Sequence, residues 1–75
     1  MKIQFLGSIF KPEQKLIDKV ESNPPPTVPQ LLSELGYPGE QHRFISVIVG
    51  GRRLRFNESI ASVEEIIITV PVGGG

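Results

Sequence analysis

The chain has 75 residues, with eight basic and eight acidic side chains and a formal net charge of zero. This length predicts a single domain, residues 1–75, with one thin core and no deep substrate cavity. The balanced charge produces no long-range field and therefore disfavours nucleic-acid binding. Because the chain has no cysteine, disulfides, thiolate catalysis and the usual sulfur-ligated zinc sites are excluded. No apolar run approaches the length of a membrane span, so we expect a soluble cytoplasmic protein.

The first part of the chain predicts two strands. Residues 2–6 alternate between polar and apolar side chains, which is typical of a half-buried strand. Residues 14–21 predict a second strand, with Leu16 and Val20 facing inward, or with Ile17 in their place. The two strands would form an N-terminal hairpin with an irregular turn.

A rigid connector and a helix are predicted next. The prolines at 24–26 fix φ and remove three donors, which favours a stiff loop over a proline-rich recognition segment. Thr27 is placed as the N-cap of a helix over residues 28–35, with Gln30 completing a capping box. Gly36 follows where a helix C-terminus commonly has glycine. Four apolar residues recur at helical spacing: Val28, Leu31, Leu32 and Leu35.

The second half of the chain predicts three more strands. Residues 43–49 are rich in β-branched side chains, and the glycines at 50–51 predict a two-residue hairpin turn into a short strand over residues 52–56. Residues 57–63 predict a loop, and residues 65–72 the last strand. The inward side chains of that strand would be Ile66, Ile68 and Val70.

These elements predict an α+β domain, in which a mixed sheet of four or five strands packs on one main helix. A single amphipathic helix can bury its apolar stripe only against one face of the sheet. The last strand is expected to lie centrally, next to the first.

Four segments spread over nearly the whole chain resemble one known family: residues 5–8, 27–36, 47–51 and 71–75, the last reading Pro71-Val72-Gly73-Gly74-Gly75. With the element order, they resemble the β-grasp fold of ubiquitin-like proteins. Within that group the chain is similar to the MoaD/ThiS sulfur carriers, which comprise the small subunit of molybdopterin synthase and the thiamine-pathway carrier.

The resemblance implies that the protein works through the carboxylate of Gly75. An E1-like enzyme of the MoeB/ThiF type would use ATP to convert that carboxylate to an acyl-adenylate, which then becomes a thiocarboxylate. A synthase subunit of the MoaE or thiazole-synthase type would accept the sulfur. The chain itself would bind no cofactor or metal, and would be a carrier or small subunit and not a stand-alone catalyst.

The residue types of the tail suit this chemistry. Glycine has no Cβ and opens φ/ψ space, so Gly74 would set the final approach of Gly75 in a narrow channel while Gly73 adds freedom. Pro71 and Val72 would keep the chain stiff and extended where it leaves the sheet. We expect residues 73–75 to be flexible in the absence of a partner, as chain ends commonly are.

Three apolar residues are candidates for partner binding. By alternation, Phe44, Ile48 and Ile67 would face away from the helix, on the open side of the sheet. Ubiquitin-like proteins generally dock partners through this face. Scattered exposed apolar residues are the alternative, and a shift of phase would bury Phe44.

A basic cluster and one histidine complete the candidates. Arg52, Arg53 and Arg55 would either keep an edge strand soluble or attract an acidic partner surface or the phosphate of a pterin. His42 is expected in a loop, exposed to solvent.

Two other functions remain open for the same sequence. A ubiquitin-like modifier would join Gly75 to a lysine of another protein, and a β-grasp interaction module would have an inert tail. For a sulfur carrier, the product remains open among molybdopterin, thiamine thiazole and a thiolated tRNA base.

Overall fold

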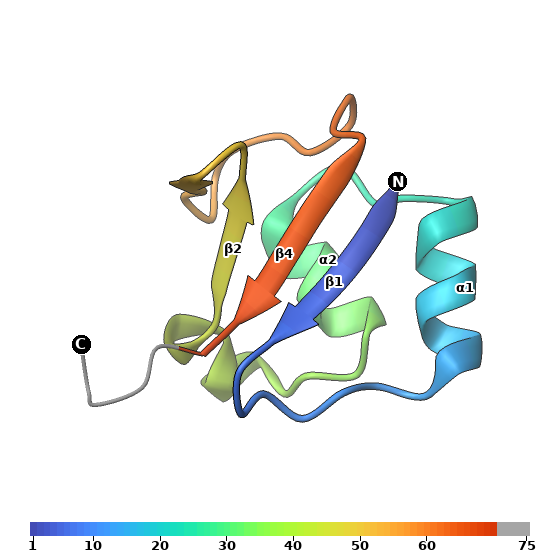
Figure 1. Ribbon diagram of the computed structural model, residues 1–75, viewed down its shortest axis with the longest axis vertical. Helices are drawn as coiled ribbons and strands as arrows, with labels where there is room; N and C mark the ends of the chain where they lie inside the picture. Colours follow the sequence, from blue (N-terminus) through green and yellow to red (C-terminus); the bar gives the residue numbers. More distant parts are fainter. Residues whose placement is uncertain (71–75) are drawn as a thin grey trace.

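In the described part of the chain, four strands form one mixed sheet in the order β1-β4-β2-β3 (Figure 1). The computed structural model describes residues 1–70. Strand β4 pairs in parallel with β1 and antiparallel with β2, so the last strand lies beside the first, as predicted. The strands are β1 (Lys2–Leu6), β2 (Ser46–Val49), β3 (Arg52–Arg53) and β4 (Glu65–Thr69).

Within residues 1–70, three helices accompany the sheet: α1 (Gln14–Ser22), α2 (Val28–Glu34) and the 3₁₀ helix η1 (Gly39–Phe44). Helix α2 lies behind the sheet in Figure 1, and α1 stands beside β1. The molecule is therefore an α+β domain with two α-helices where one was predicted. None of the helices within residues 1–70 has the length and apolar character needed to cross a bilayer.

The prediction of a second strand at residues 14–21 was wrong, because this segment forms α1. A strand with Leu16 and Val20 inward would also have buried Asp18, and the opposite phase would have buried two lysines. Helical spacing avoids both costs, since Ile17 and Val20 enter the core one turn apart and Asp18 stays exposed. The predicted N-terminal hairpin is consequently not formed.

Helix α2 confirms the most detailed prediction. The Thr27 side chain accepts a hydrogen bond from the Gln30 amide at 3.5 Å, and its hydroxyl donates to the Gln30 side chain at 3.1 Å. At the other end, Gly36 has φ of +96°, and the Tyr37 amide donates back to the Leu32 carbonyl. This pairing is the one found in a Schellman C-cap, so both ends of the helix are fixed by local sequence.

Thr27→Ala is expected to lower the free energy of unfolding by about 1 kcal/mol, because it leaves the Gln30 amide without its cap. Thr27→Ser retains the oxygen and is the matched control, with a change near zero. Urea unfolding followed by circular dichroism measures both. Equal destabilisation by the two substitutions would show that the methyl group, and not the cap, is what matters.

The β2–β3 hairpin also forms as predicted, with shorter strands. Gly50 and Gly51 have φ of +59° and +80°, the left-handed pair that a two-residue type I′ turn requires. Strand β2 begins at Ser46 and not at Arg43, because the preceding residues wind into η1. Strand β4 ends at Thr69, so Val70 is outside the strand although it was predicted within it, and residues 71–72 of the predicted range lie outside the described residues.

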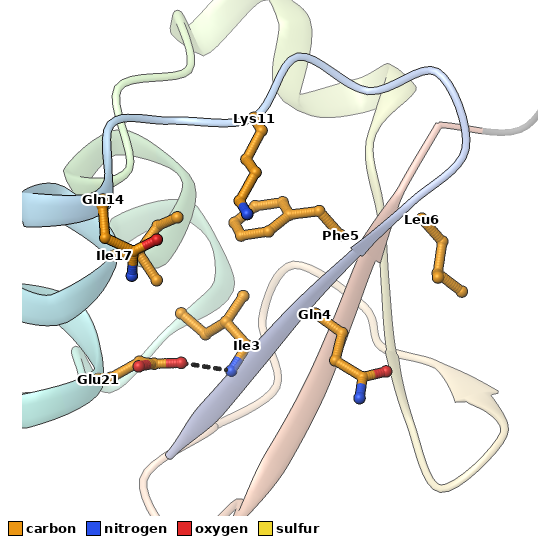
Figure 2. Close-up of a pocket in the computed structure, with 8 residues that line it drawn as sticks. All are labelled: Ile3, Gln4, Phe5, Leu6, Lys11, Gln14, Ile17 and Glu21. Carbon is orange, nitrogen blue, oxygen red and sulfur yellow. Dashed lines mark hydrogen bonds between the residues drawn. The ribbon is translucent and has the colours of Figure 1, made fainter.

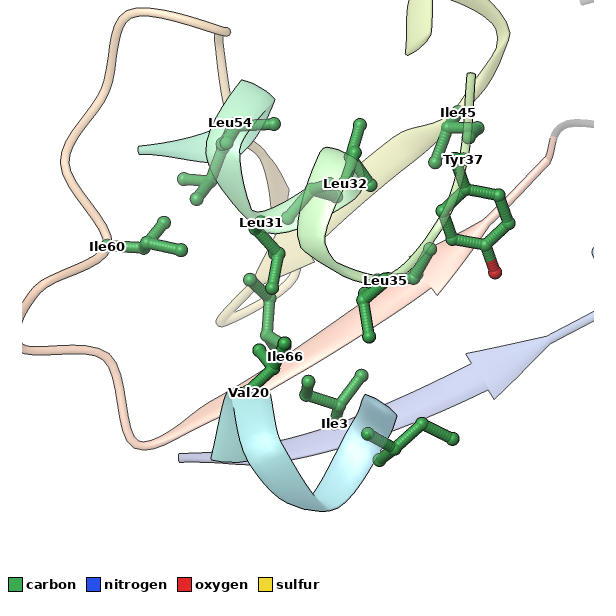
Figure 3. Packing of buried hydrophobic residues seen from close by; sticks show 14 residues of the cluster. Ile3, Val20, Leu31, Leu32, Leu35, Tyr37, Ile45, Leu54, Ile60 and Ile66 are labelled. Atoms are coloured by element: carbon green, nitrogen blue, oxygen red, sulfur yellow. The ribbon is translucent and has the colours of Figure 1, made fainter. Parts of the chain in front are cut away.

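The core lies between the inner face of the sheet and α2, with α1 closing one side (Figure 3). Leu31 of α2 points toward Ile66 of β4, with Val20 of α1 nearby, and Leu35, the C-cap residue of α2, also faces the sheet. Fourteen buried hydrophobic residues form this cluster: Ile3, Ile17, Val20, Val28, Leu31, Leu32, Leu35, Tyr37, Ile45, Val47, Leu54, Ile60, Ile66 and Ile68. The predicted inward residues Ile66 and Ile68 of β4 are fully buried, whereas Val70, which follows the strand, is half-buried.

Candidate functional site

The predicted reacting segment, residues 71–75, lies outside the described residues, so the structure bears on it only through its point of departure. That point is Val70, which directly follows β4. Because β4 lies between two other strands, its last residue is paired on both sides, with Leu6 of β1 and Ser46 of β2.

An apolar pocket of about 220 Å³ lies at the end of β4. Its rim includes two large exposed side chains, Phe10 at 81% and Phe44 at 57% of full exposure. Rings this exposed keep more than half of their surface in contact with water, and they can bury that apolar surface against a partner. We call this surface the Val70 pocket; its lining residues are Ser8, Ile9, Phe10, Tyr37, Gln41, Phe44, Ile45 and Val70.

Local backbone structure holds the walls of the Val70 pocket together. Gly7 turns the chain after β1 with φ of +76°, and a Cβ at this position would lie 3.4 Å from the Thr69 hydroxyl oxygen of β4. Glycine therefore permits both the turn and the close passage of the two segments. Further along, the Tyr37 hydroxyl donates to the Phe10 carbonyl at 2.5 Å, which fastens the loop before α1 to the end of α2.

His42 extends this set of hydrogen bonds, and the prediction that it is a solvated loop residue was wrong. Its side chain is buried within η1, and Nε2 lies 2.9 Å from the Tyr37 carbonyl oxygen. Since a carbonyl only accepts, Nε2 must carry a proton and donate it. The ring thus anchors η1, and with it Phe44, to the end of α2.

Burial raises the pKa of Tyr37 to about 12. A group with a raised folded pKa contributes stability that is complete below its unfolded pKa, near 10, and is lost as the pH rises toward 12. Tyr37 is the only tyrosine in the chain, so ultraviolet absorbance of tyrosinate reports it alone. We expect a midpoint near 12 in the folded protein and near 10 in urea; equal midpoints would contradict the buried position.

Two of the three predicted docking residues lie together on the open face of the sheet. Ile48 of β2 and Ile67 of β4 are register partners, both half-buried on the face away from α2. Phe44 does not join them, because it lies in η1 and not in a strand. It lines the Val70 pocket instead, with the Arg43 guanidinium carbon 4.8 Å from the centre of its ring.

The basic cluster lies on and after β3, the edge strand opposite β1. Arg52 forms a two-pronged ion pair with Glu58 at 3.0 and 3.2 Å, and the Arg55 amide donates to the same carboxylate. These contacts, led by the Arg52 hydrogen bond, hold the pKa of Glu58 below its usual value. The Arg52 side chain is thus occupied by its ion pair with Glu58. Arg53 and Arg55 instead border a shallow pocket of about 280 Å³.

Sequence reasoning missed Phe10 and Tyr37. Phe10 follows a predicted turn, and the only signal there was an isolated aromatic residue between Gly7 and Pro12. Tyr37 follows the predicted helix end, where a Schellman motif places a residue that commonly makes an apolar contact. Neither pattern indicates that the two residues meet, because they lie 27 positions apart and are brought together only by the fold.

Comparison of the chain with family models, with curated proteins and with solved structures finds no match. Within residues 1–70, no three metal-binding side chains are grouped as a metal site.

Proposed function

We propose that this chain is a sulfur carrier of the MoaD/ThiS type, with a ubiquitin-like β-grasp fold, acting in the cytoplasm. The carboxylate of Gly75 is adenylated by an E1-like enzyme that consumes ATP and releases pyrophosphate. A sulfur donor then displaces AMP and leaves a thiocarboxylate. The product passes its sulfur to a synthase subunit in molybdopterin or thiamine synthesis.

The observation that carries the proposal is the position of Val70. Val70, which precedes the predicted tail at residues 71–75, directly follows the central strand β4. It lines an apolar pocket that has two exposed aromatic rings. An adenylating enzyme needs a rigid surface to grip and a pliable segment to draw into its channel. The Val70 pocket offers such a surface, and the glycines at 73–75 begin three residues further along the chain.

The sheet supports the β-grasp part of the proposal. Strand β4 lies between β1 and β2, parallel to the first strand of the chain, with α2 behind the sheet. The observed fold departs from the expected β-grasp at the N-terminal hairpin, where α1 takes the place of the second strand. This change lies at the β1 side of the sheet and leaves the β4 end of the molecule intact.

The composition of the tail supports the reaction itself. Ordering a flexible residue costs roughly 1–2 kcal/mol. Burial of apolar rings in the docked complex can offset the free energy needed to order three glycines in a channel. Pro71 has a fixed φ and Val72 is β-branched, which are residue types that favour extended backbone, and the carboxylate of Gly75 is the proposed reacting group. No thiol is needed, in agreement with the absence of cysteine.

The test is an intact-mass measurement on the protein purified from its native cells through an N-terminal tag. We expect a species that ends at Gly75 and has exchanged one oxygen for one sulfur. A variant lacking Gly75 is the control and should show no such species. Larger conjugates linked through Gly75 would instead identify a protein modifier, and a tail never adenylated by any E1-like enzyme would overturn both.

A further inference from the structure

The outer edge of β1 carries main-chain groups without partners. The Lys2 amide donates to the Glu64 carbonyl at 2.8 Å, which fixes the phase of the parallel β1–β4 ladder. By alternation, Gln4 and Leu6 also direct their main-chain groups to β4, while Ile3 and Phe5 direct theirs away from the sheet. Strand β1 is the end of the sheet within the described residues, so no strand meets these groups.

A side chain of α1 already occupies one position on this edge. Glu21 accepts a hydrogen bond from the Ile3 amide at 2.8 Å, in the place where a neighbouring strand would supply a carbonyl (Figure 2). The Phe5 amide and carbonyl make no hydrogen bond with any residue from 1 to 70. The edge is thus closed at Ile3 and open at Phe5.

A groove of about 340 Å³ runs along the open part of this edge, between β1 and α1 (Figure 2). Phe5 and Ile17 give it apolar walls, and the Lys11 side chain extends into it from the loop before α1. Of the two ion pairs found in residues 1–70, neither includes Lys11. The groove therefore combines an unpaired peptide group and apolar walls with the Lys11 ammonium group at the Phe5 end, while the Glu21 carboxylate at the Ile3 end accepts a hydrogen bond from the main chain.

These features specify the occupant. An unpaired amide and carbonyl at a strand edge bind extended backbone, and they cannot be satisfied by a helix, whose own groups are already paired. The Lys11 charge selects an acidic side chain. Helix α1 stands beside β1 and obstructs the edge of a second folded sheet, so a single extended segment is the form that fits (Figure 1).

We propose that the groove between β1 and α1 binds an extended acidic segment of a partner protein, which adds to β1 at Phe5 as a short strand. The segment's main chain pairs with Phe5, and its acidic side chain meets Lys11. The site involves neither Gly75 nor the Val70 pocket, and it stands independently of the proposed function.

The test uses the full chain labelled with nitrogen-15. The probe is an acetylated, amidated peptide of alternating valine and threonine with one central glutamate. In the protein alone, the Phe5 amide should exchange with solvent faster than the Gln4 amide, which is bonded within the sheet. On titration, the Phe5 signal should shift progressively and its exchange should slow.

Two matched changes separate backbone pairing from charge. A peptide N-methylated on both valines beside the glutamate cannot pair fully and should lose the effect at Phe5. Lys11→Glu should weaken binding of the glutamate peptide roughly fivefold or more, and a lysine-containing peptide should recover binding to this variant. Lys11 is exposed, so the variant should keep its fold.

Several results would overturn the proposal. One is a Phe5 amide that is already protected in the protein alone; another is a Phe5 signal unmoved at saturating peptide. Equal binding of the N-methylated peptide would exclude strand addition. Protection of Phe5 that grows with protein concentration would show that a second copy of the chain, and not a partner segment, covers the edge.

Discussion

Ile68→Ala is expected to lower the free energy of unfolding by about 2–5 kcal/mol. Ile68 is fully buried in the central strand, with Phe5 of β1 and Val47 of β2 as its register partners. Truncation removes a contact surface shared by three strands and leaves a cavity that a well-packed sheet cannot close. At roughly 0.05–0.15 kcal/mol per residue, the whole domain has about 4–11 kcal/mol. A single substitution thus removes a large part of the stability.

The matched control is Ile67→Ala, one position earlier on the same strand. Ile67 has the same side chain but is only half-buried, on the open face, so we expect a loss of about 1 kcal/mol. Urea unfolding measures both losses as shifts of the midpoint at constant slope. Equal losses would mean that the two faces of β4 are equally packed, which contradicts the described fold.

Phe44→Ala is expected to lower the rate of Gly75 adenylation by a factor of roughly 5–30, which corresponds to the loss of a binding contact worth 1–2 kcal/mol. The ring is more than half exposed at the rim of the Val70 pocket, so its removal should change stability by less than about 0.5 kcal/mol. Pyrophosphate exchange catalysed by an E1-like enzyme of the MoeB/ThiF type measures the rate. The effect should appear in KM more than in kcat, because docking and not chemistry is altered.

Phe56→Ala is the control for that experiment. Phe56 is also a partly exposed phenylalanine, at 41%, but it lines the shallow pocket with Arg53 and Arg55 and lies outside the Val70 pocket. Its removal should leave adenylation unchanged. If Phe56→Ala slows the reaction as much as Phe44→Ala, or if neither does, the Val70 pocket is not the docking surface.

The parts of the fold that sequence predicts well are those fixed by local chemistry. The cap at Thr27, the C-terminal turn at Gly36 and the glycine hairpin at 50–51 each depend on residues within one or two turns of each other. Their geometry follows from φ preferences and from the pairing of a few amides. The structure reproduces all three.

Helix α1 shows where local reasoning fails. When only apolar positions are counted, Leu16 and Val20 fit one face of a strand and Ile17 the other. All three also fit one face of a helix. The decisive information was polar, since either strand phase would have placed charged side chains in the core. Even so, nothing local indicates that Glu21 reaches the Ile3 amide, because that contact joins residues 18 positions apart.

The candidate site divides in the same way. Alternation was sufficient to place Ile48 and Ile67 on one face, because both lie within regular strands. It failed for Phe44, which the 3₁₀ helix removes from the strand, and for His42, which that helix carries into the interior. The hydrogen bonds that assemble the Val70 pocket link three separate segments and have no signature in any one of them.

The parallel pairing of β1 with β4 has a consequence for synthesis of the chain on the ribosome. Lys2 pairs with Glu65, so the centre of the sheet joins residues 63 positions apart, and most of the protein must be made before this pairing begins. Long-range parallel pairing is also slow to form. The sheet therefore cannot close until β4 has been synthesised and has left the exit tunnel, although local elements such as α2 and the 50–51 turn can form earlier. Only chains that have been translated at least through β4 can therefore form the complete sheet.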